Sequence, residues 1–184
     1  MDWSGKTIVL GVSGGIAAYK AAALTSALRH QGADVHVVMT LNAAEFVTPL
    51  TFQTLSQNRV VLEMFDDKPE WEIDHVALAD SADVVIIAPA TANIIGKIAA
   101  GIADDSLSTL VMSTRAPVVI APAMNVHMYE NPIVQGNIAR LRELGYHFVD
   151  PAEGALACGY EGKGRLAEPE DIIARAAEIL SPGK

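Results

Sequence analysis

Four short runs rich in valine and isoleucine limit the folds open to this chain more than any other feature. They read TIVLGV at 7–12, ADVHVVMT at 33–40, ADVVIIAPA at 82–90 and APVVIAPA at 116–123. Their apolar residues are largely continuous, which is typical of parallel strands covered by helices on both faces. A weaker run, YHFVDP at 146–151, predicts one more strand.

Helical segments separate these strand-like runs. The last of them opens with Pro169, Glu170 and Asp171, residue types that favour the first turn of a helix. Alternating strands and helices predict an α/β fold with three layers, a Rossmann-like or flavodoxin-like doubly wound parallel sheet. One domain is expected over 1–184, because no linker or repeat interrupts the pattern. The predicted helices span 16–31, 93–100, 105–114, 130–144 and 169–180.

The composition narrows the classes of partner. A formal net charge of −9 disfavours nucleic acid and anionic membranes, so an anionic substrate would be held by local donors. The apolar runs fall short of the ~18 residues that a membrane span needs. A lone cysteine, Cys158, cannot form an internal disulfide, so we expect a cytoplasmic protein. No metal is expected, because no cluster of ligand residues has the required spacing.

Small and polar residues follow the strand-like runs. The carboxyl ends of parallel strands meet at one edge of the sheet, where open α/β folds bind their ligands. We therefore expect these residues to form one continuous polar rim. They are Ser13, Gly14 and Gly15 after the first run, Thr40 after the second, Pro89, Ala90, Thr91, Ala92 and Asn93 after the third, and Pro122, Ala123, Met124 and Asn125 after the fourth.

The segment GVSGGIAAYK at 11–20 places two glycines where a strand turns into a helix. Exposed N–H groups and the helix dipole would suit a phosphate there. The segment has neither the Walker pattern nor the G-x-G-x-x-G spacing, and Thr40 stands where a dinucleotide site would have an acidic residue. A dinucleotide is therefore disfavoured, and a mononucleotide remains open. The alternative is a merely tight turn.

Three polar side chains of the rim suit ligand binding. The hydroxyl of Thr91 and the amide of Asn93 can bond to phosphate or ring atoms, and the amide of Asn125 can bind a carboxylate. Each of them can equally cap a helix. Both uses stay open, since capping and ligand binding are compatible.

Two other residues are candidates for catalysis. His75 follows an irregular segment at 63–74 and opens a predicted helix, where an imidazole can act as a base. A lone histidine is more often structural than catalytic. Cys158 lies in a glycine-rich flap at about 153–166 and is either incidental or chemical.

Five motifs occur in a fixed order along the chain: GVSGGIAAYK, HVALADSAD, APATANIIGKIAAGIADD, PAMNVHMY and GALACGYEGKGRLAEP. Together they resemble the motifs of the flavin-dependent cysteine decarboxylases, from about residue 6 to residue 180. Within that family the resemblance is greatest to the enzymes that decarboxylate phosphopantothenoylcysteine in coenzyme A biosynthesis. These occur alone or joined to a phosphopantothenate–cysteine ligase.

The resemblance implies FMN as the cofactor, a small-molecule substrate, and a trimer or a dodecamer of four trimers with the active site between subunits. It implies catalytic roles for His75, Asn125 and Cys158. Asn125 and Met124 would contact the substrate, while Lys20, Lys163 and Arg165 are candidates for its phosphate on grounds of charge and position. The residues implied to bind FMN are Ser13, Gly14, Gly15, Thr40, Pro89, Thr91, Ala92, Asn93 and Ala121.

The implied reaction is chemically reasonable. Direct loss of CO2 from an N-acylated cysteine would leave an unstabilised carbanion. Oxidation of the thiol to a thioaldehyde places an electron acceptor beside that carbon, and a flavin can take and return the hydride. His75 would assist thiol oxidation and Asn125 would orient the carboxylate. Cys158 would donate a proton when the ene-thiol is reduced.

Three alternatives differ in chemistry. A peptidyl-cysteine decarboxylase of the same family would release the ene-thiol and would not need Cys158. The motifs around Asn125 and Cys158 argue against a flavin prenyltransferase-like protein. A flavin-binding regulatory subunit without activity would not need His75 and Cys158, and both are present.

Overall fold

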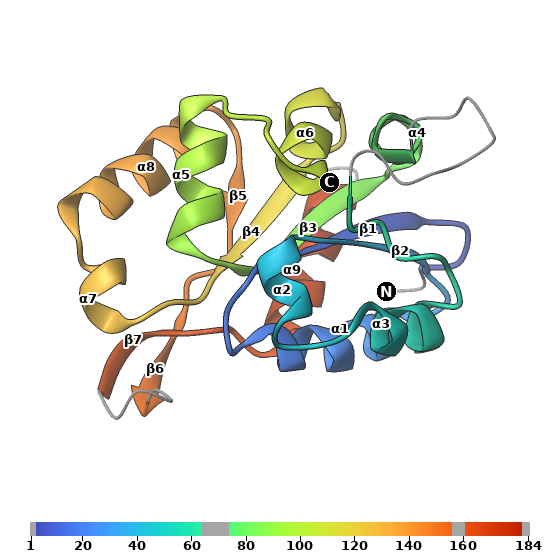
Figure 1. Cartoon of the computed structure of the whole chain (residues 1–184), viewed down its shortest axis with the longest axis horizontal. Helices are drawn as coiled ribbons and strands as arrows, with labels where there is room; N and C mark the ends of the chain where they lie inside the picture. Colours follow the sequence, from blue (N-terminus) through green and yellow to red (C-terminus); the bar gives the residue numbers. More distant parts are fainter. Residues whose placement is uncertain (1–2, 64–73, 156–160, 182–184) are drawn as a thin grey trace.

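Five parallel strands form the central sheet of the computed structural model, which describes residues 3–63, 74–155 and 161–181. Their order across the sheet is β2-β1-β3-β4-β5, as Figure 1 shows. The predicted α/β class and doubly wound parallel sheet are confirmed. The strands are β1 (Thr7–Val12), β2 (Asp34–Met39), β3 (Val84–Ala90), β4 (Val118–Pro122) and β5 (His147–Phe148).

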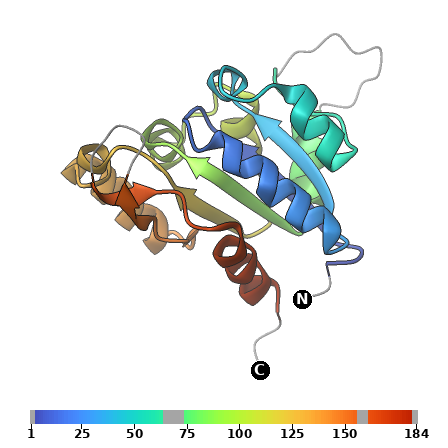
Figure 2. The ribbon, with the colours of Figure 1, turned by 90° about the horizontal axis from the view of Figure 1, so that it is seen from below.

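Helices cover both faces of the sheet. One face packs against α1, α3 and α9, and the other against α4, α5, α6 and α8. Figure 2 shows α1 and α9 side by side on the first face. The helices are α1 (Ala18–His30), α2 (Leu41–Ala44), α3 (Pro49–Ser56), α4 (Asp74–Ser81), α5 (Ala92–Ala100), α6 (Ser106–Ser113), α7 (Val126–Tyr129), α8 (Pro132–Glu143) and α9 (Pro169–Leu180).

The strand side chains divide between two apolar cores. In β1, Ile8 and Leu10 point into the core beneath α1 and α9, while Val9 points into the core beneath α5 and α6. All three are fully buried. Because both faces are covered, the strands carry apolar residues at consecutive positions, which is the pattern that the sequence shows.

The order of the strands reverses between β1 and β3. From β1 the chain passes to β2 at one edge and then returns to β3 on the other side. The connection after β1 therefore runs to one side of the sheet and the connection after β3 runs to the other. Open α/β sheets bind ligands at such a switch point, outside the carboxyl ends of the strands. This point fixes where a functional site is expected.

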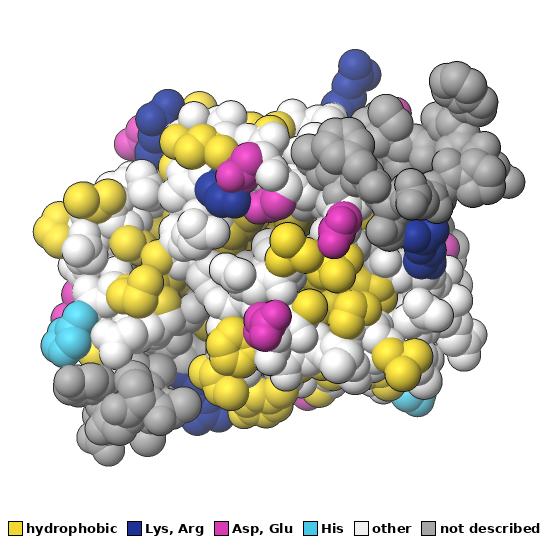
Figure 3. All heavy atoms as spheres, in the orientation of Figure 1, with side chains coloured by type: hydrophobic (Ala, Val, Ile, Leu, Met, Phe, Trp, Pro, Cys, Tyr) yellow, Lys and Arg dark blue, Asp and Glu magenta, His cyan; other side chains and the backbone are white. Residues whose placement is uncertain are grey.

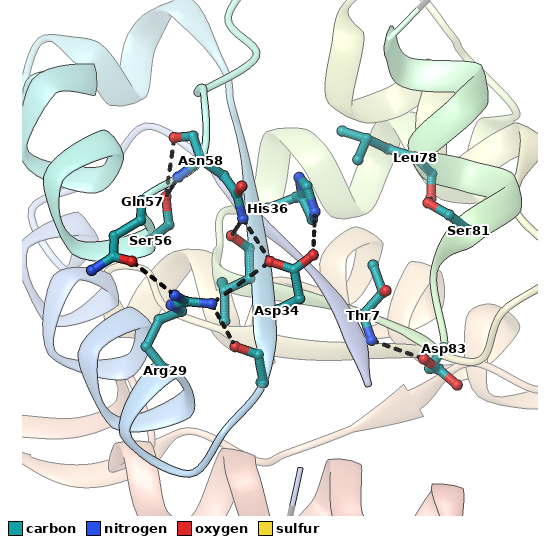
Figure 4. A network of polar contacts seen from close by, with 12 residues as sticks. Thr7, Arg29, Asp34, His36, Ser56, Gln57, Asn58, Leu78, Ser81 and Asp83 are labelled. Carbon is teal, nitrogen blue, oxygen red and sulfur yellow. Dashed lines mark hydrogen bonds and ion pairs between the residues drawn. The ribbon is translucent and has the colours of Figure 1, made fainter. Parts of the chain in front are cut away.

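Polar contacts at the amino end of β2 show a structural use of histidine (Figure 4). The Asp34 carboxylate accepts a hydrogen bond from Asn58 Nδ2 at 2.8 Å and lies 3.0 Å from His36 Nε2. Burial alone would raise the pKa of Asp34, but the bonds from Asn58 and His36 outweigh it and lower that pKa. His36 thus belongs to a contact network at the amino ends of the strands, opposite the switch point.

Candidate functional site

The loops after β1, β2 and β3 touch one another at the carboxyl edge of the sheet. A Cβ atom on Gly14 would overlap the side chain and backbone of Asn42, which follows β2. A Cβ atom on Gly15 would lie 3.4 Å from Thr91 Cγ2, just after β3. Gly14 is therefore required for the close approach of the first two loops. The predicted rim is continuous across these three strands.

Ser13 links the loop after β1 to the loop after β3 at the switch point. Its side chain is only 2% exposed. The hydroxyl donates to the Pro89 carbonyl at 2.7 Å and accepts from the Thr91 N–H at 3.0 Å. The sequence predicted a contact of Ser13 with a cofactor, and the structure shows its hydroxyl engaged with the turn after β3. Ser13 thus sets the position of Thr91.

The turn before α1 presents backbone donors. Within the described part of the chain, the N–H groups of Gly14, Gly15, Ile16 and Ala17 meet no protein acceptor. The hydroxyl of Thr91 makes no capping bond to α5, whereas Thr40 Oγ1 accepts from the Ala43 N–H at 3.3 Å. Unpaired N–H groups at the start of a helix are what a phosphate requires.

Other predicted members of the rim differ in exposure. Asn93, in the first turn of α5, is exposed, and Ala92 beside it is partly exposed. Pro89 and Ala121 lie inside β3 and β4 and are buried, so a ligand at the rim would reach them through backbone atoms. Pro89 occupies a register shift between β3 and β4, where a strand tolerates a residue without an N–H.

Asn125 begins the short helix α7 after β4. Its Oδ1 atom accepts from the His127 N–H at 2.9 Å, which confirms the capping role weighed from the sequence. This bond fixes which end of the amide faces the helix. The NH2 end is the donor that a substrate carboxylate would need. Met124 and Asn125 are both partly exposed.

The flap predicted at 153–166 is in part a hairpin. Strands β6 (Ala152–Ala155) and β7 (Glu161–Arg165) pair in antiparallel fashion. The Met124 N–H donates to the Gly164 carbonyl at 2.9 Å, so the hairpin lies on the loop that carries Asn125. Cys158 falls between the two strands in the sequence and lies outside the described residues.

His75 is the second residue of α4, and its side chain is not among those that the structure describes. That helix packs against α6 and β1. Figures 1 and 2 both place it at the opposite end of the molecule from α7 and the β6–β7 hairpin. A single chain therefore brings the loops of Ser13, Thr40 and Thr91 together, but it does not bring α4 to the loop of Asn125.

A family model described as "Flavoprotein" matches residues 2–181, nearly the whole chain. The chain belongs to the flavoprotein family. A coenzyme A biosynthesis bifunctional protein, CoaBC of Bacillus subtilis (strain 168), is 56% identical over 168 residues, which cover 91% of this flavoprotein and 41% of that relative. The chain thus spans well under half the length of this curated relative.

Two solved structures extend the comparison. A PPC decarboxylase mutant complexed with pantothenoylaminoethenethiol is 30% identical, with a TM-score of 0.83 and coverage of 94% of this flavoprotein and 97% of that chain. The FMN-dependent cysteine decarboxylase SpaF is 32% identical, also with a TM-score of 0.83, over 97% of this chain and 99% of its own. The predicted resemblance to the cysteine decarboxylases is confirmed.

The cations predicted to hold a substrate phosphate already have carboxylate neighbours in this flavoprotein. Lys20 Nζ lies 3.2 Å from Glu168, and an Arg165 nitrogen lies 2.7 Å from the same carboxylate. Lys20 first, and Arg165 after it, lower the pKa of Glu168. Lys163 lies 3.7 Å from Glu153 instead. Glu168 was not predicted to take part: Arg165 is only three residues away from it, but Lys20 is far away along the chain.

The surface above the rim carries apolar side chains. Ile16, Tyr19, Leu41, Phe46 and Leu50 are each at least half exposed. They belong to the turn before α1, to the first turn of α1 and to the segment from α2 to α3, and Figure 3 shows yellow side chains gathered over this part of the face. In the described residues, no helix is long and apolar enough to cross a membrane.

Proposed function

We propose that this flavoprotein is an FMN-dependent phosphopantothenoylcysteine decarboxylase, a carbon–carbon lyase that forms phosphopantetheine in coenzyme A biosynthesis. The observation that carries the proposal is the similarity to PPC decarboxylase over 94% of the chain and 97% of the relative. The CoaBC relative supports the same pathway. Release of CO2 from phosphopantothenoylcysteine by the FMN-loaded protein is the direct test.

The rim fits FMN. The N–H groups of Gly14 to Ala17 would hold the phosphate, and Thr40 and Thr91 stand on either side of that turn. When bound, FMN would accept a hydride from the cysteine side chain of the substrate and later return it. The chain's task is to hold the reacting carbon, supply and remove protons, and keep water away.

Three residues would perform those tasks. His75 would take the thiol proton as the carbon–sulfur bond is oxidised to a thioaldehyde. The NH2 group of Asn125 would bind the carboxylate, whose departure as CO2 leaves an electron pair that the thiocarbonyl takes up. Cys158 would donate a proton when the resulting ene-thiol is reduced. A role for a cysteine after CO2 is lost is supported by a solved relative, a cysteine-to-serine mutant of PPC decarboxylase complexed with pantothenoylaminoethenethiol.

We expect Ser13→Ala to weaken FMN binding, because the Thr91 N–H and the Pro89 carbonyl would lose their buried partner. The dissociation constant of FMN, followed by flavin fluorescence, should rise by about tenfold, equivalent to ~1.4 kcal/mol. Ser26→Ala serves as the control, since Ser26 contacts His30 within α1. An unchanged dissociation constant in Ser13→Ala would remove Ser13 from the cofactor site.

The proposal includes an assembly in which the active site lies between subunits of a trimer, alone or as four trimers. The separation of α4 from the loop of Asn125 supports it, because His75 and Asn125 would then meet only across two copies. Coupling to a phosphopantothenate–cysteine ligase is supported by the bifunctional relative. We also propose a cytoplasmic location, in keeping with the lone cysteine.

Mixing of two inactive variants tests this assembly. His75→Asn and Asn125→Ala are each expected to be inactive alone. If each site takes His75 from one subunit and Asn125 from another, random assembly from equal amounts of the two variants should restore about one quarter of the wild-type activity. If each site lies within one chain, every subunit of the mixture stays damaged and activity remains absent at all ratios.

A second candidate is a peptidyl-cysteine decarboxylase. Its support is the similarity, at 32% identity and a TM-score of 0.83, to SpaF, which is described as an FMN-dependent cysteine decarboxylase without a stated substrate. This candidate predicts an ene-thiol product and reduced flavin after one turnover, whereas the main proposal predicts a saturated thiol.

A further inference from the structure

Strand β7 lies directly on the loop that holds Asn125. The Met124 N–H donates to the Gly164 carbonyl at 2.9 Å. On the other side of Asn125, the side chain of Val126 meets Gly162 of the same strand. Asn125 is thus flanked by two residues that are both in contact with β7.

Glycine makes this contact possible. A Cβ atom on Gly164 would overlap the carbonyl oxygen of Met124, a backbone atom that cannot rotate away. A Cβ atom on Gly162 would lie 2.8 Å from Val126 Cγ2, which is a side-chain atom. The sequence predicted that these glycines belong to a flap. In the structure they are positions of close approach.

Gly154 provides an internal comparison. It pairs with Gly162 across the hairpin and has a φ of +149°, close to the +156° of Gly164. Among the described residues, a Cβ atom on Gly154 would meet only Arg165, at an ordinary 3.7 Å. Alanine at either position carries a similar backbone strain, but only alanine at Gly164 would push β7 off the Met124 carbonyl.

We infer that Gly164 is a positioning residue. It holds the hairpin against the loop of Asn125, so that loss of CO2 and the later reduction of the ene-thiol stay coupled. The inference rests on the proposed function. Asn125 serves the loss of CO2, whereas the chain between β6 and β7 contains Cys158, the proton donor of the last step. In that step the ene-thiol gains a hydride at one carbon, from the flavin reduced earlier, and a proton at the other, which yields the saturated thiol.

Displacing β7 should therefore uncouple these steps. In Gly164→Ala, we expect CO2 release to continue while formation of the saturated thiol falls on the order of 10²-fold, as small misplacements can cause. The ene-thiol becomes the main product. Gly154→Ala should keep the wild-type product ratio.

A readout independent of turnover is amide exchange. The Met124 N–H is bonded to the Gly164 carbonyl, so hydrogen exchange at Met124 should be about tenfold faster in Gly164→Ala than in Gly154→Ala. Both variants should still bind FMN, which the visible spectrum checks. Equal Met124 exchange and equal product ratios in the two variants would overturn the inference.

A second pair of variants guards against a Gly164→Ala protein that fails to fold. Gly162→Ala should shift the products toward the ene-thiol, and adding Val126→Ala, which makes room for the new methyl group, should restore them. If the products of Gly162→Ala shift toward the ene-thiol and adding Val126→Ala does not restore them, the close packing of β7 on this loop is not what controls the product ratio. If the wild-type protein released no CO2, the proposed function would fail, while the Met124 exchange comparison would still decide whether β7 is seated as inferred.

Discussion

Replacing His75 with asparagine should abolish release of CO2 while the protein still binds FMN and stays yellow. The substrate thiol has a pKa near 8.5 and must lose its proton before oxidation, and an imidazole of pKa near 6.5 is the neutral base available at pH 7. Loss of a general base typically lowers rates by about 10² to 10⁴. The measurement is CO2 release from phosphopantothenoylcysteine, with the visible spectrum of the same sample as the check on FMN.

His36→Asn is the matched control for that experiment. His36 lies in β2 and contacts Asp34 at the amino end of the sheet, away from the rim. Its loss should leave turnover intact and reduce the free energy of unfolding by at most ~1 kcal/mol, as expected for a polar contact near the surface. Turnover retained in His75→Asn would remove His75 from the mechanism.

Replacing Cys158 with serine should leave FMN binding and CO2 release in place but stop the reaction at the ene-thiol. A thiol with a pKa near 8.5 can donate a proton at neutral pH, whereas an aliphatic hydroxyl is a far weaker acid. We expect the yield of saturated phosphopantetheine to fall at least about 10²-fold. Mass analysis of the products distinguishes the two thiols.

Cys158→Ala provides the comparison for the serine variant. Both variants should accumulate ene-thiol, because neither supplies an acidic proton. A normal yield of saturated product from either of them would exclude Cys158 as the donor and leave the thiol without a role in the reaction.

The sheet was predictable because its signal is local. Both faces are covered, so the strands at 7–12 and 84–90 had to be apolar at nearly every position and the strand at 34–39 had to be apolar in its second half, and the loops after them had to lie at one edge. The helices of a single turn were not predicted. α2 and α7 are too short to show a helical period, and each depends on a capping side chain, Thr40 or Asn125.

The contacts within the site could not be predicted from the sequence. The hydrogen bond from the Thr91 N–H to the Ser13 hydroxyl joins residues far apart in the chain, and so does the hydrogen bond from the Met124 N–H to the Gly164 carbonyl. No periodicity records such pairs, because they depend on how the loops after different strands converge. The same limit applies to His75, whose motif suggested a role but whose distance from the Asn125 loop emerges only from the placement of α4.

The electron balance of the reaction tests the central claim most directly. FMN-loaded protein is incubated anaerobically with an excess of phosphopantothenoylcysteine and no added electron acceptor. Many turnovers, one saturated phosphopantetheine for each CO2 and flavin that remains oxidised at the end are the results that the proposed function predicts. No CO2, or a single turnover that leaves reduced flavin and ene-thiol, would contradict it.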